Sequence, residues 1–303
     1  MPKKPKPRRQ QARFDPNRGS KPPEMVEMVE GVWILKALGA VLGFGLLCAY
    51  VTLCVLFAHT QWQLVLRPSR TVSATPASVD LAFTEVHFGV DGTGQPQLDG
   101  WWIPADAASD PTVLMLHGGD GTMADALPQA RTLHEAGLNV LLFDYRGYGH
   151  SGGQHPAEIT MQEDAHTALD YLLNTRKVRP IELILYGHGL GAPLALQLCA
   201  SVQMECPVLV LDAPDGDLLQ RVSADSRAKL VPMSLLFHER FPLAEPLRAS
   251  PSAKLLITYT AGSAPQILKD ARDPKMLAEL KSGDTDAYLS TLRRFLDEYV
   301  PHD

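Results

Sequence analysis

The stretch ELILYGHGLGAPLALQLCA, residues 182–200, joins an apolar run of strand length to a second apolar run with a helical pattern that begins at Gly191. Similar units surround it. Apolar runs at 113–116, 139–145 and 207–213 indicate strands, and the segments near 124–136 and 160–173 indicate helices. Continuous Val, Leu and Ile strands separated by helices predict a mostly parallel central sheet with helices on both faces, an α/β fold.

Two further segments complete the predicted sheet. Residues 82–90 and 97–103 show a looser alternation around the turn sequence Asp91-Gly92-Thr93-Gly94, which favours an antiparallel hairpin at the edge. Residues 254–259 are expected to form the last strand. No internal repeat and no second domain is expected, so we interpret residues 63–303 as one domain.

The composition fits a single globular domain with an extension. The chain has 303 residues, of which 45% are hydrophobic and 20% charged, which excludes a disordered or collagen-like protein. Four cysteines, Cys48, Cys54, Cys199 and Cys206, are too few and too unevenly placed for a disulfide scaffold or a zinc site. We therefore expect no metal. Cys199 and Cys206 are expected to pack as small hydrophobic residues, with a disulfide between them as the alternative.

The net charge of −6 hides a division between the two ends of the chain. Residues 1–36 contain nine Lys and Arg against four Asp and Glu, which leaves 19 against 30 for the rest. A protein that binds nucleic acid would concentrate its positive charge on the folded domain, whereas here that domain is acidic. Nucleic acid is therefore not an expected partner.

The basic end reads as a tail followed by a membrane anchor. Residues 1–30 are poor in apolar groups and are expected to be a disordered cytoplasmic tail. Residues 31–62 are expected to form the anchor helix. Its central 22 residues, 37–58, carry no charge and are long enough to cross a bilayer of about 30 Å. A cleaved signal peptide is the alternative, but its apolar region would be shorter and its leader short.

The charge asymmetry also predicts the orientation of this helix. Because Lys and Arg are in excess before it, the N-terminus is expected in the cytoplasm and the domain across the membrane, which is the periplasm in a double-membrane bacterium. Trp33 and Trp62 lie where aromatic side chains commonly fix the depth of a membrane helix.

Three motifs give the domain a resemblance to a known superfamily. They are Leu116-His117-Gly118-Gly119, the loop DYRGYGHSGG at 144–153, and the elbow YGHGLG at 186–191. Together they resemble the α/β hydrolases, and more narrowly the membrane-anchored, serine-aminopeptidase-like group. The resemblance implies that the amides of Gly119 and Leu190 form an oxyanion hole. It also implies that His117, Gly118, Asp144, Arg146, Gly187 and Gly191 have structural roles.

The elbow departs from the pattern of that family at its apex. The family motif is Gly-x-Ser-x-Gly, with the nucleophilic serine in the centre. Here Gly189 occupies the central position, between Gly187 and Gly191. The turn can still form, but the residue that would attack a carbonyl has no side chain.

The other two positions of the catalytic triad are also altered. By the resemblance, the histidine would lie in the stretch 281–287, where this chain has Asp284 and Asp286, and the acid would lie at Ser263. Some α/β hydrolases carry the acid one strand earlier, which would nominate Asp212 or Asp215. His188 is adjacent to the apex, and we expect its side chain to point away from the pocket. The sequence therefore predicts that no base is in place.

These observations leave two hypotheses about function. The first is a catalytically degenerate, membrane-anchored protein that binds an acyl, peptide or protein ligand at the old pocket and needs no cofactor. The second is an esterase or peptidase with a relocated nucleophile. Residues 218–246 lie where the family inserts a cap, and they are expected to cover the pocket.

Overall fold

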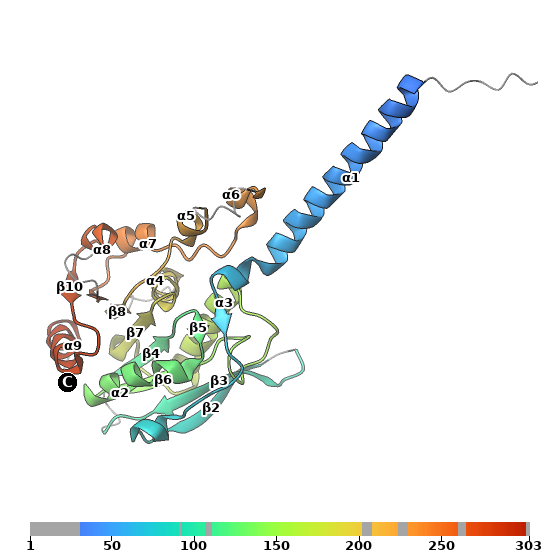
Figure 1. Ribbon diagram of the computed structural model, residues 1–303. Coiled ribbons are helices and arrows are strands. Elements are labelled where there is room, and N and C mark those ends of the chain that lie inside the picture. Colours follow the sequence, from blue (N-terminus) through green and yellow to red (C-terminus); the bar gives the residue numbers. More distant parts are fainter. Residues whose placement is uncertain are drawn as a thin grey trace, which may run out of the picture. The chain divides into compact units, whose positions relative to one another are not determined.

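The computed structural model describes residues 31–90, 92–106, 111–201, 208–223, 230–259 and 265–300. The chain divides into two compact units between Val51 and Thr52. Helix α1 (Gly31–Thr60) runs across this division. The second unit contains the sheet and the helices that pack on it (Figure 1).

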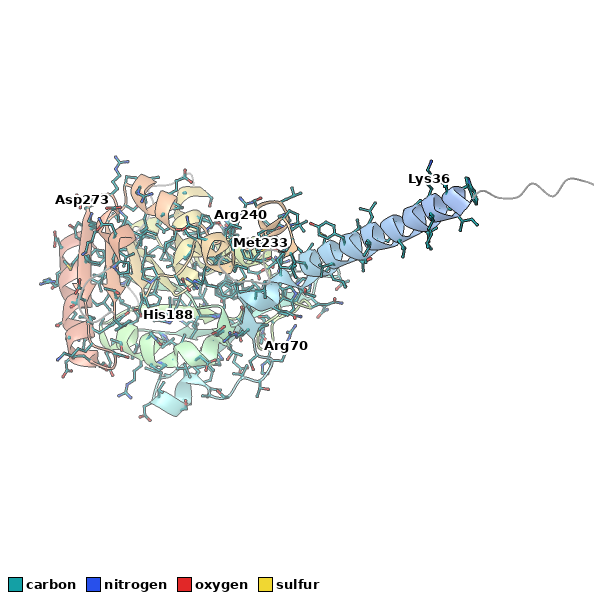
Figure 2. The ribbon with its side chains drawn as sticks, turned by 45° about the horizontal axis from the view of Figure 1, so that its top comes forward. Lys36, Arg70, His188, Met233, Arg240 and Asp273 are labelled. Atoms are coloured by element: carbon teal, nitrogen blue, oxygen red, sulfur yellow. The ribbon has the colours of Figure 1, made fainter. Side chains whose placement is uncertain are left out.

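Helix α1 has the length and composition of a membrane span. None of its residues is buried, and Lys36, near its start, is its only lysine or arginine (Figure 2). Among the described residues it is the one helix long and apolar enough to cross a membrane, with a mean hydropathy of 2.4. At 1.5 Å per residue its 30 residues extend about 45 Å.

The described strands of the second unit form an eight-stranded sheet in the order β10-β9-β8-β7-β4-β6-β3-β2. Strand β3 runs antiparallel to both β2 and β6, and all other neighbours are parallel. The bounds are β2 (Thr84–Val90), β3 (Pro96–Ile103), β4 (Thr112–Leu116), β6 (Asn139–Phe143), β7 (Leu183–His188), β8 (Val208–Asp212), β9 (Lys254–Thr258) and β10 (Lys275–Glu279). A separate parallel pair joins β1 (Arg67–Pro68) to β5 (Asp120–Gly121).

Apolar side chains that alternate along the central strands build one core on each face of the sheet. Leu114 and Leu185 belong to the core that contains helices α3 (Glu158–Asp170) and α4 (Gly191–Ser201). Val113 and Ile184 belong to the core that contains α2 (Leu127–Glu135) and α9 (Thr285–Tyr299). The predicted parallel sheet with helices on both faces is therefore confirmed, as is the antiparallel edge hairpin.

The predicted end of the sheet was wrong, because β9 is not the last strand. Strand β10 follows it and pairs with it in parallel, with Met276 opposite Leu255. Its sequence, KMLAE, begins and ends with a charged residue and is only partly buried, as expected for a strand at a sheet edge. This composition hides it from a search for apolar runs.

Short helices occupy the region expected to be the cap. They are α5 (Leu218–Ser223), α6 (Met233–Leu236) and α7 (Ala244–Ala249), and α8 (Gln266–Lys269) follows β9. Met233 and Arg240 mark this segment in Figure 2. Phe237 and Phe241 are completely buried, so the segment is part of the core of the domain.

The residues directly after α1 are held against the same segment. The buried side chain of Gln61 accepts a hydrogen bond of 2.7 Å from the amide of His238, and its Nε2 lies 3.3 Å from Nδ1 of that histidine. Trp62 stacks on His155 with ring centroids 5.3 Å apart. Leu64 and Val65, which come next, line the largest cavity described below.

Candidate functional site

The turn between β7 and α4 has the backbone of a nucleophile elbow. Gly189 has a φ of +55°, and its amide donates a hydrogen bond of 3.0 Å to the carbonyl oxygen of Asp212. A Cβ atom at Gly187 would lie 2.5 Å from the Cα of Ala192, and one at Gly191 would lie 2.0 Å from the carbonyl oxygen of Leu116. These two glycines are therefore required by the close approach of strand and helix.

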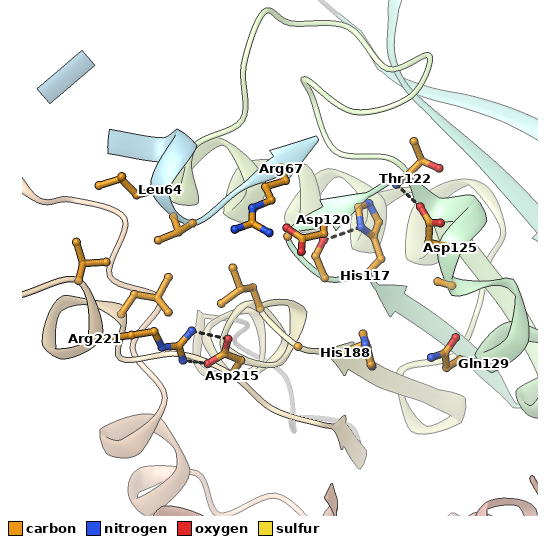
Figure 3. A pocket seen from close by; sticks show the side chains of 18 residues that line it. Leu64, Arg67, His117, Asp120, Thr122, Asp125, Gln129, His188, Asp215 and Arg221 are labelled. Atoms are coloured by element: carbon orange, nitrogen blue, oxygen red, sulfur yellow. Dashed lines mark hydrogen bonds and ion pairs between the residues drawn. The ribbon is translucent and has the colours of Figure 1, made fainter. Parts of the chain in front are cut away.

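The apex itself is open. A Cβ atom at Gly189 would meet only the Cα of Gly118, at 3.8 Å. A cavity of about 570 Å³ lies over this turn (Figure 3). It is lined by the apolar residues Leu64, Val65, Ala126, Leu190, Leu218 and Val222, and by the polar residues Arg67, His117, Asp120, Thr122, Asp125, Gln129, His188, Asp215 and Arg221, with Gly118, Gly119 and Gly189 at its floor.

Two backbone amides at this floor are available to a ligand. Gly119 follows β4 and Leu190 follows the apex, and both residues line the cavity. Neither amide has a backbone acceptor within the described ranges. They occupy the positions from which the resemblance expects an oxyanion hole, where amides would stabilise negative charge on a carbonyl oxygen.

His188 faces the cavity, so the prediction that it points away was wrong. Its side chain is 35% exposed, and Nδ1 lies 3.4 Å from Oδ2 of the fully buried Asp212. The reason is the register of the sheet, in which His188 of β7 is the direct neighbour of Asp212 of β8. Neighbouring residues on parallel strands project to the same face, so the imidazole and the carboxylate meet at the ends of the two strands.

Two tyrosine hydroxyls form a chain of hydrogen bonds to the carboxylate of Asp212. Tyr186 donates a hydrogen bond of 2.6 Å to Oδ2, and the hydroxyl of Tyr288 donates to that of Tyr186 at 3.1 Å. Burial, with the Asp212 carboxylate as the next cause, raises the pKa of both phenols well above the usual value. Both phenols therefore remain protonated and act as hydrogen-bond donors.

The other residues nominated as the acid lie elsewhere. Asp215 lines the cavity but is paired with Arg221, whose Nη1 donates a hydrogen bond of 2.9 Å to Oδ2 (Figure 3). Ser263 lies outside the described residues. Of the candidates that the structure describes, Asp212 is the one placed beside an imidazole in the cavity.

The stretch expected to hold the family histidine forms the start of the last helix. Asp284 caps α9, because its Oδ1 accepts a hydrogen bond of 3.0 Å from the amide of Ala287. Asp286 is exposed in the first turn of that helix. Neither residue lines the 570 Å³ cavity.

His117 and Asp144 form a buried pair beside the cavity, and Arg146 forms separate, partly exposed ion pairs. The Nδ1 atom of His117 donates a hydrogen bond of 2.8 Å to the carbonyl oxygen of Gly118, and Nε2 lies 3.5 Å from Oδ1 of Asp144. That oxygen accepts a hydrogen bond of 2.6 Å from the amide of Met123. Arg146 pairs with Asp164 at 2.5 Å and with Glu163 at 2.6 Å.

Burial perturbs the titration of both members of the His117 and Asp144 pair. It raises the pKa of Asp144 to about 7 and lowers the pKa of His117 to about 4. Through the carboxyl group, the free energy of unfolding falls as the pH rises from about 4 to about 7. Through the imidazole, it falls as the pH drops from about 6.5 to about 4. The two effects oppose each other in the natural chain.

We expect the Asp144→Asn variant to separate these effects. As the pH rises from 4.5 to 7.5, the unfolding free energy of the variant should increase relative to that of the natural chain, by an amount on the order of a few kcal/mol. Thermal unfolding of both chains at several pH values measures this difference. A difference that does not change with pH would contradict the expectation.

No group of three or more His, Cys, Asp or Glu side chains that could hold a metal ion is found in the described ranges. Cys199 is disulfide-bonded, and Cys206 lies outside the described residues. The sequence analysis favoured a packed thiol at Cys199, and the structure instead has this cysteine in a disulfide bond. Cys48 and Cys54 both lie in α1.

Solved structures share this architecture. The esterase Pf2001 of Pyrococcus furiosus gives a TM-score of 0.59 at 21% identity, and the match covers 78% of this chain and 98% of the esterase. The α/β hydrolase GrgF from Penicillium sp. sh18 gives a TM-score of 0.57 at 19% identity, covering 73% of this chain and 99% of GrgF. At these identities the likeness shows the fold alone.

Sequence comparison shows the family. The profile described as serine aminopeptidase, S33, matches residues 107–284. The uncharacterised protein Rv2307c of Mycobacterium tuberculosis (strain H37Rv) is 34% identical over 217 residues, which cover 67% of this chain and 75% of Rv2307c. Protein bem46 of Schizosaccharomyces pombe is 36% identical over 105 residues, 34% of this chain and 35% of bem46. With this fold and this elbow, the chain belongs to the serine aminopeptidase (S33) family of α/β hydrolases.

Proposed function

We propose that this chain is a single-pass membrane protein whose domain binds a ligand in the cavity over Gly189 and does not act as a serine hydrolase. The observation that carries the proposal is the glycine at the apex of an otherwise intact elbow. Without a hydroxyl or thiol at that position, no acyl-enzyme can form there. The ligand is an acyl compound, a peptide or a segment of a protein partner.

The lining of the cavity supports this proposal. Among the described residues that line it, Thr122 is the only one with a side-chain hydroxyl, and none is a serine or cysteine. Thr122 is 1% exposed, and its Oγ1 accepts a hydrogen bond of 3.2 Å from the amide of Ala124. Its hydroxyl is therefore engaged in capping a short helix and is not presented to a ligand.

The membrane part of the proposal is supported by two independent features. Helix α1 carries no charged residue from Ala37 to Ala58, and the excess of Lys and Arg before this stretch favours a cytoplasmic N-terminus. In that orientation the domain lies across the membrane, in the periplasm of a double-membrane bacterium. The disulfide bond at Cys199 is consistent with an oxidising compartment outside the cytoplasm.

The test uses the full-length chain with two readouts. Alkaline phosphatase fused after residue 300 should be active in a bacterial host, whereas a fusion before residue 31 should be inactive. A fluorophosphonate probe applied to the same chain in detergent micelles should leave it unlabelled. An active N-terminal fusion would contradict the topology, and a covalent adduct in the domain would contradict the loss of serine catalysis.

The runner-up function, a hydrolase with a relocated centre, is favoured by one specific observation. His188 stands in the cavity with the carboxylate of Asp212 behind it. This arrangement supplies a base, although the described residues that line the cavity include no serine or cysteine. Its chemical consequence is developed next.

A further inference from the structure

The cavity holds an imidazole in the arrangement of a general base. Because Nδ1 of His188 is buried and directed at Asp212, the opposite ring nitrogen, Nε2, is directed at the cavity that the side chain lines. A carboxylate behind the imidazole orients the ring and stabilises it once it has accepted a proton. The distance of 3.4 Å is longer than a hydrogen bond, as is common for such pairs before a ligand binds.

The carboxylate is built to remain in this position. Asp212 is completely buried, and one of its oxygens, Oδ1, has no hydrogen-bond partner in the described ranges. The hydroxyl of Tyr186 fixes the other oxygen, and Tyr288 supports that hydroxyl in turn. The imidazole of His188 is the neighbour of this carboxylate on the cavity side, with Nδ1 3.4 Å from Oδ2.

The apex beside this base has room for a small nucleophile. A side chain at Gly189 would point into open space, with only the Cα of Gly118 nearby, at 3.8 Å. The Cδ2 atom of His188 lies 3.7 Å from the position that a Cβ atom of Gly118 would take, so the imidazole borders the same space. The amides of Gly119 and Leu190 line the adjoining floor. Base, space and amide donors therefore converge on one point.

We propose that His188 is a catalytic residue that activates a solvent water for direct hydrolysis of a carboxylic ester bound over Gly189. Nε2 takes a proton from the water while its oxygen forms a bond to the carbonyl carbon. The carbonyl oxygen becomes an oxyanion held by the amides of Gly119 and Leu190. The intermediate then breaks its bond to the alcohol oxygen, which receives the proton from Nε2. The products are the acid and the alcohol, and no covalent enzyme intermediate forms.

The lining of the cavity indicates the class of ester. Leu64, Val65, Leu218 and Val222 provide an apolar wall, and a cavity of about 570 Å³ suits an acyl chain of short or medium length. Asp215 and Arg221 neutralise each other. Arg67 and Asp120 are register partners in the β1–β5 pair, and Asp125 adds one further carboxylate, so two arginines face three aspartates in the described lining and the formal excess is −1. An uncharged ester fits this surface better than an ionic substrate.

This proposal rests on the proposed function, because it requires a ligand that binds over Gly189 without attack by a serine. The full-length chain in micelles is assayed with p-nitrophenyl butyrate and with the fluorophosphonate probe. We expect slow turnover without a burst and without labelling. The His188→Ala variant should lose about 10² to 10⁴ of kcat/KM, the usual contribution of a general base.

Matched variants show whether the loss is chemical. His166→Ala removes an exposed histidine of α3 that lies outside the cavity, and its turnover should match that of the natural chain. Added imidazole should restore part of the activity of His188→Ala, above the rate of imidazole alone. His188→Gln keeps a polar side chain and replaces His188→Ala as the test if that variant folds poorly. It should be as inactive as His188→Ala. Asp212→Asn should lower kcat with little change in KM, as expected for a positioning residue.

The outcomes separate this proposal from the proposed function. If the ester raises the melting temperature of the natural chain but His188→Ala hydrolyses it equally well, the general base is overturned and the binding function stands. If the fluorophosphonate probe labels the natural chain, the proposed function fails together with this inference. Histidine-dependent turnover without labelling, restored by imidazole, supports both.

Discussion

The Gly191→Ala variant is expected to lose its native fold. A Cβ atom at this position would lie 2.0 Å from the carbonyl oxygen of Leu116 and 2.8 Å from that of His117, and both are backbone atoms that cannot rotate away. Relief requires α4 to move off β4 in the centre of the domain. We expect a cost of at least about 4 kcal/mol, a large part of the stability of a typical domain. Near-UV circular dichroism of the full-length chain in micelles measures the loss.

The matched control is Gly189→Ala, two residues earlier in the same turn. Its Cβ atom would find open space, so the cost comes only from the left-handed backbone at a φ of +55°. We expect about 1 kcal/mol and an unchanged spectrum. If the two variants were equally stable, the close packing of α4 on β4 described above would be wrong.

The Gly189→Ser variant is expected to be less active than the natural chain, although it restores the family motif. The new hydroxyl has room, but it occupies the place that the proposed mechanism gives to water. No histidine lies in the stretch 281–287, where Asp284 instead caps α9. We expect kcat/KM for p-nitrophenyl butyrate to fall about 10²-fold, the scale of loss when a reacting group is displaced by about 1 Å.

The fluorophosphonate probe provides the second readout for this variant. We expect no adduct at the new serine, because residues 281–287 hold no histidine and the proposed mechanism directs His188 at water rather than at a side chain of residue 189. An adduct together with faster turnover would show that His188 activates a hydroxyl at position 189. The glycine would then be a loss of function at an otherwise competent site.

Much of the fold could be predicted from the sequence, because its central strands are buried on both faces. Strands β4 and β6 consist almost wholly of apolar residues, and such runs stand out in any sequence of this composition. Strand β10 was missed because an edge strand pairs with a neighbouring strand on one side only. Such a strand tolerates charged residues at its ends, here Lys275 and Glu279.

The site was predictable only in part. The elbow and its glycine apex follow from a local motif, since Gly187 and Gly191 satisfy a contact within one strand-to-helix turn. His188 and Asp212 are 24 positions apart in the chain, and their pairing depends on the register between strands β7 and β8. The available signal was the polar residue at the end of each strand, because equivalent ends of neighbouring parallel strands meet at one edge.

The direct succession of α1, Gln61, Leu64 and Val65 has a consequence for how ligands arrive. In the proposed topology, five residues lie between Ala58, the end of the predicted uncharged span, and Leu64 in the cavity wall. Even fully extended, the chain from Ala58 to Leu64 reaches only about 20 Å. In that topology the cavity wall at Leu64 therefore stays within headgroup range of the bilayer surface, and the domain samples molecules that partition there. Diffusion in two dimensions along the lipid leaflet would then set the supply, and amphiphilic esters would be enriched over those dissolved in bulk water.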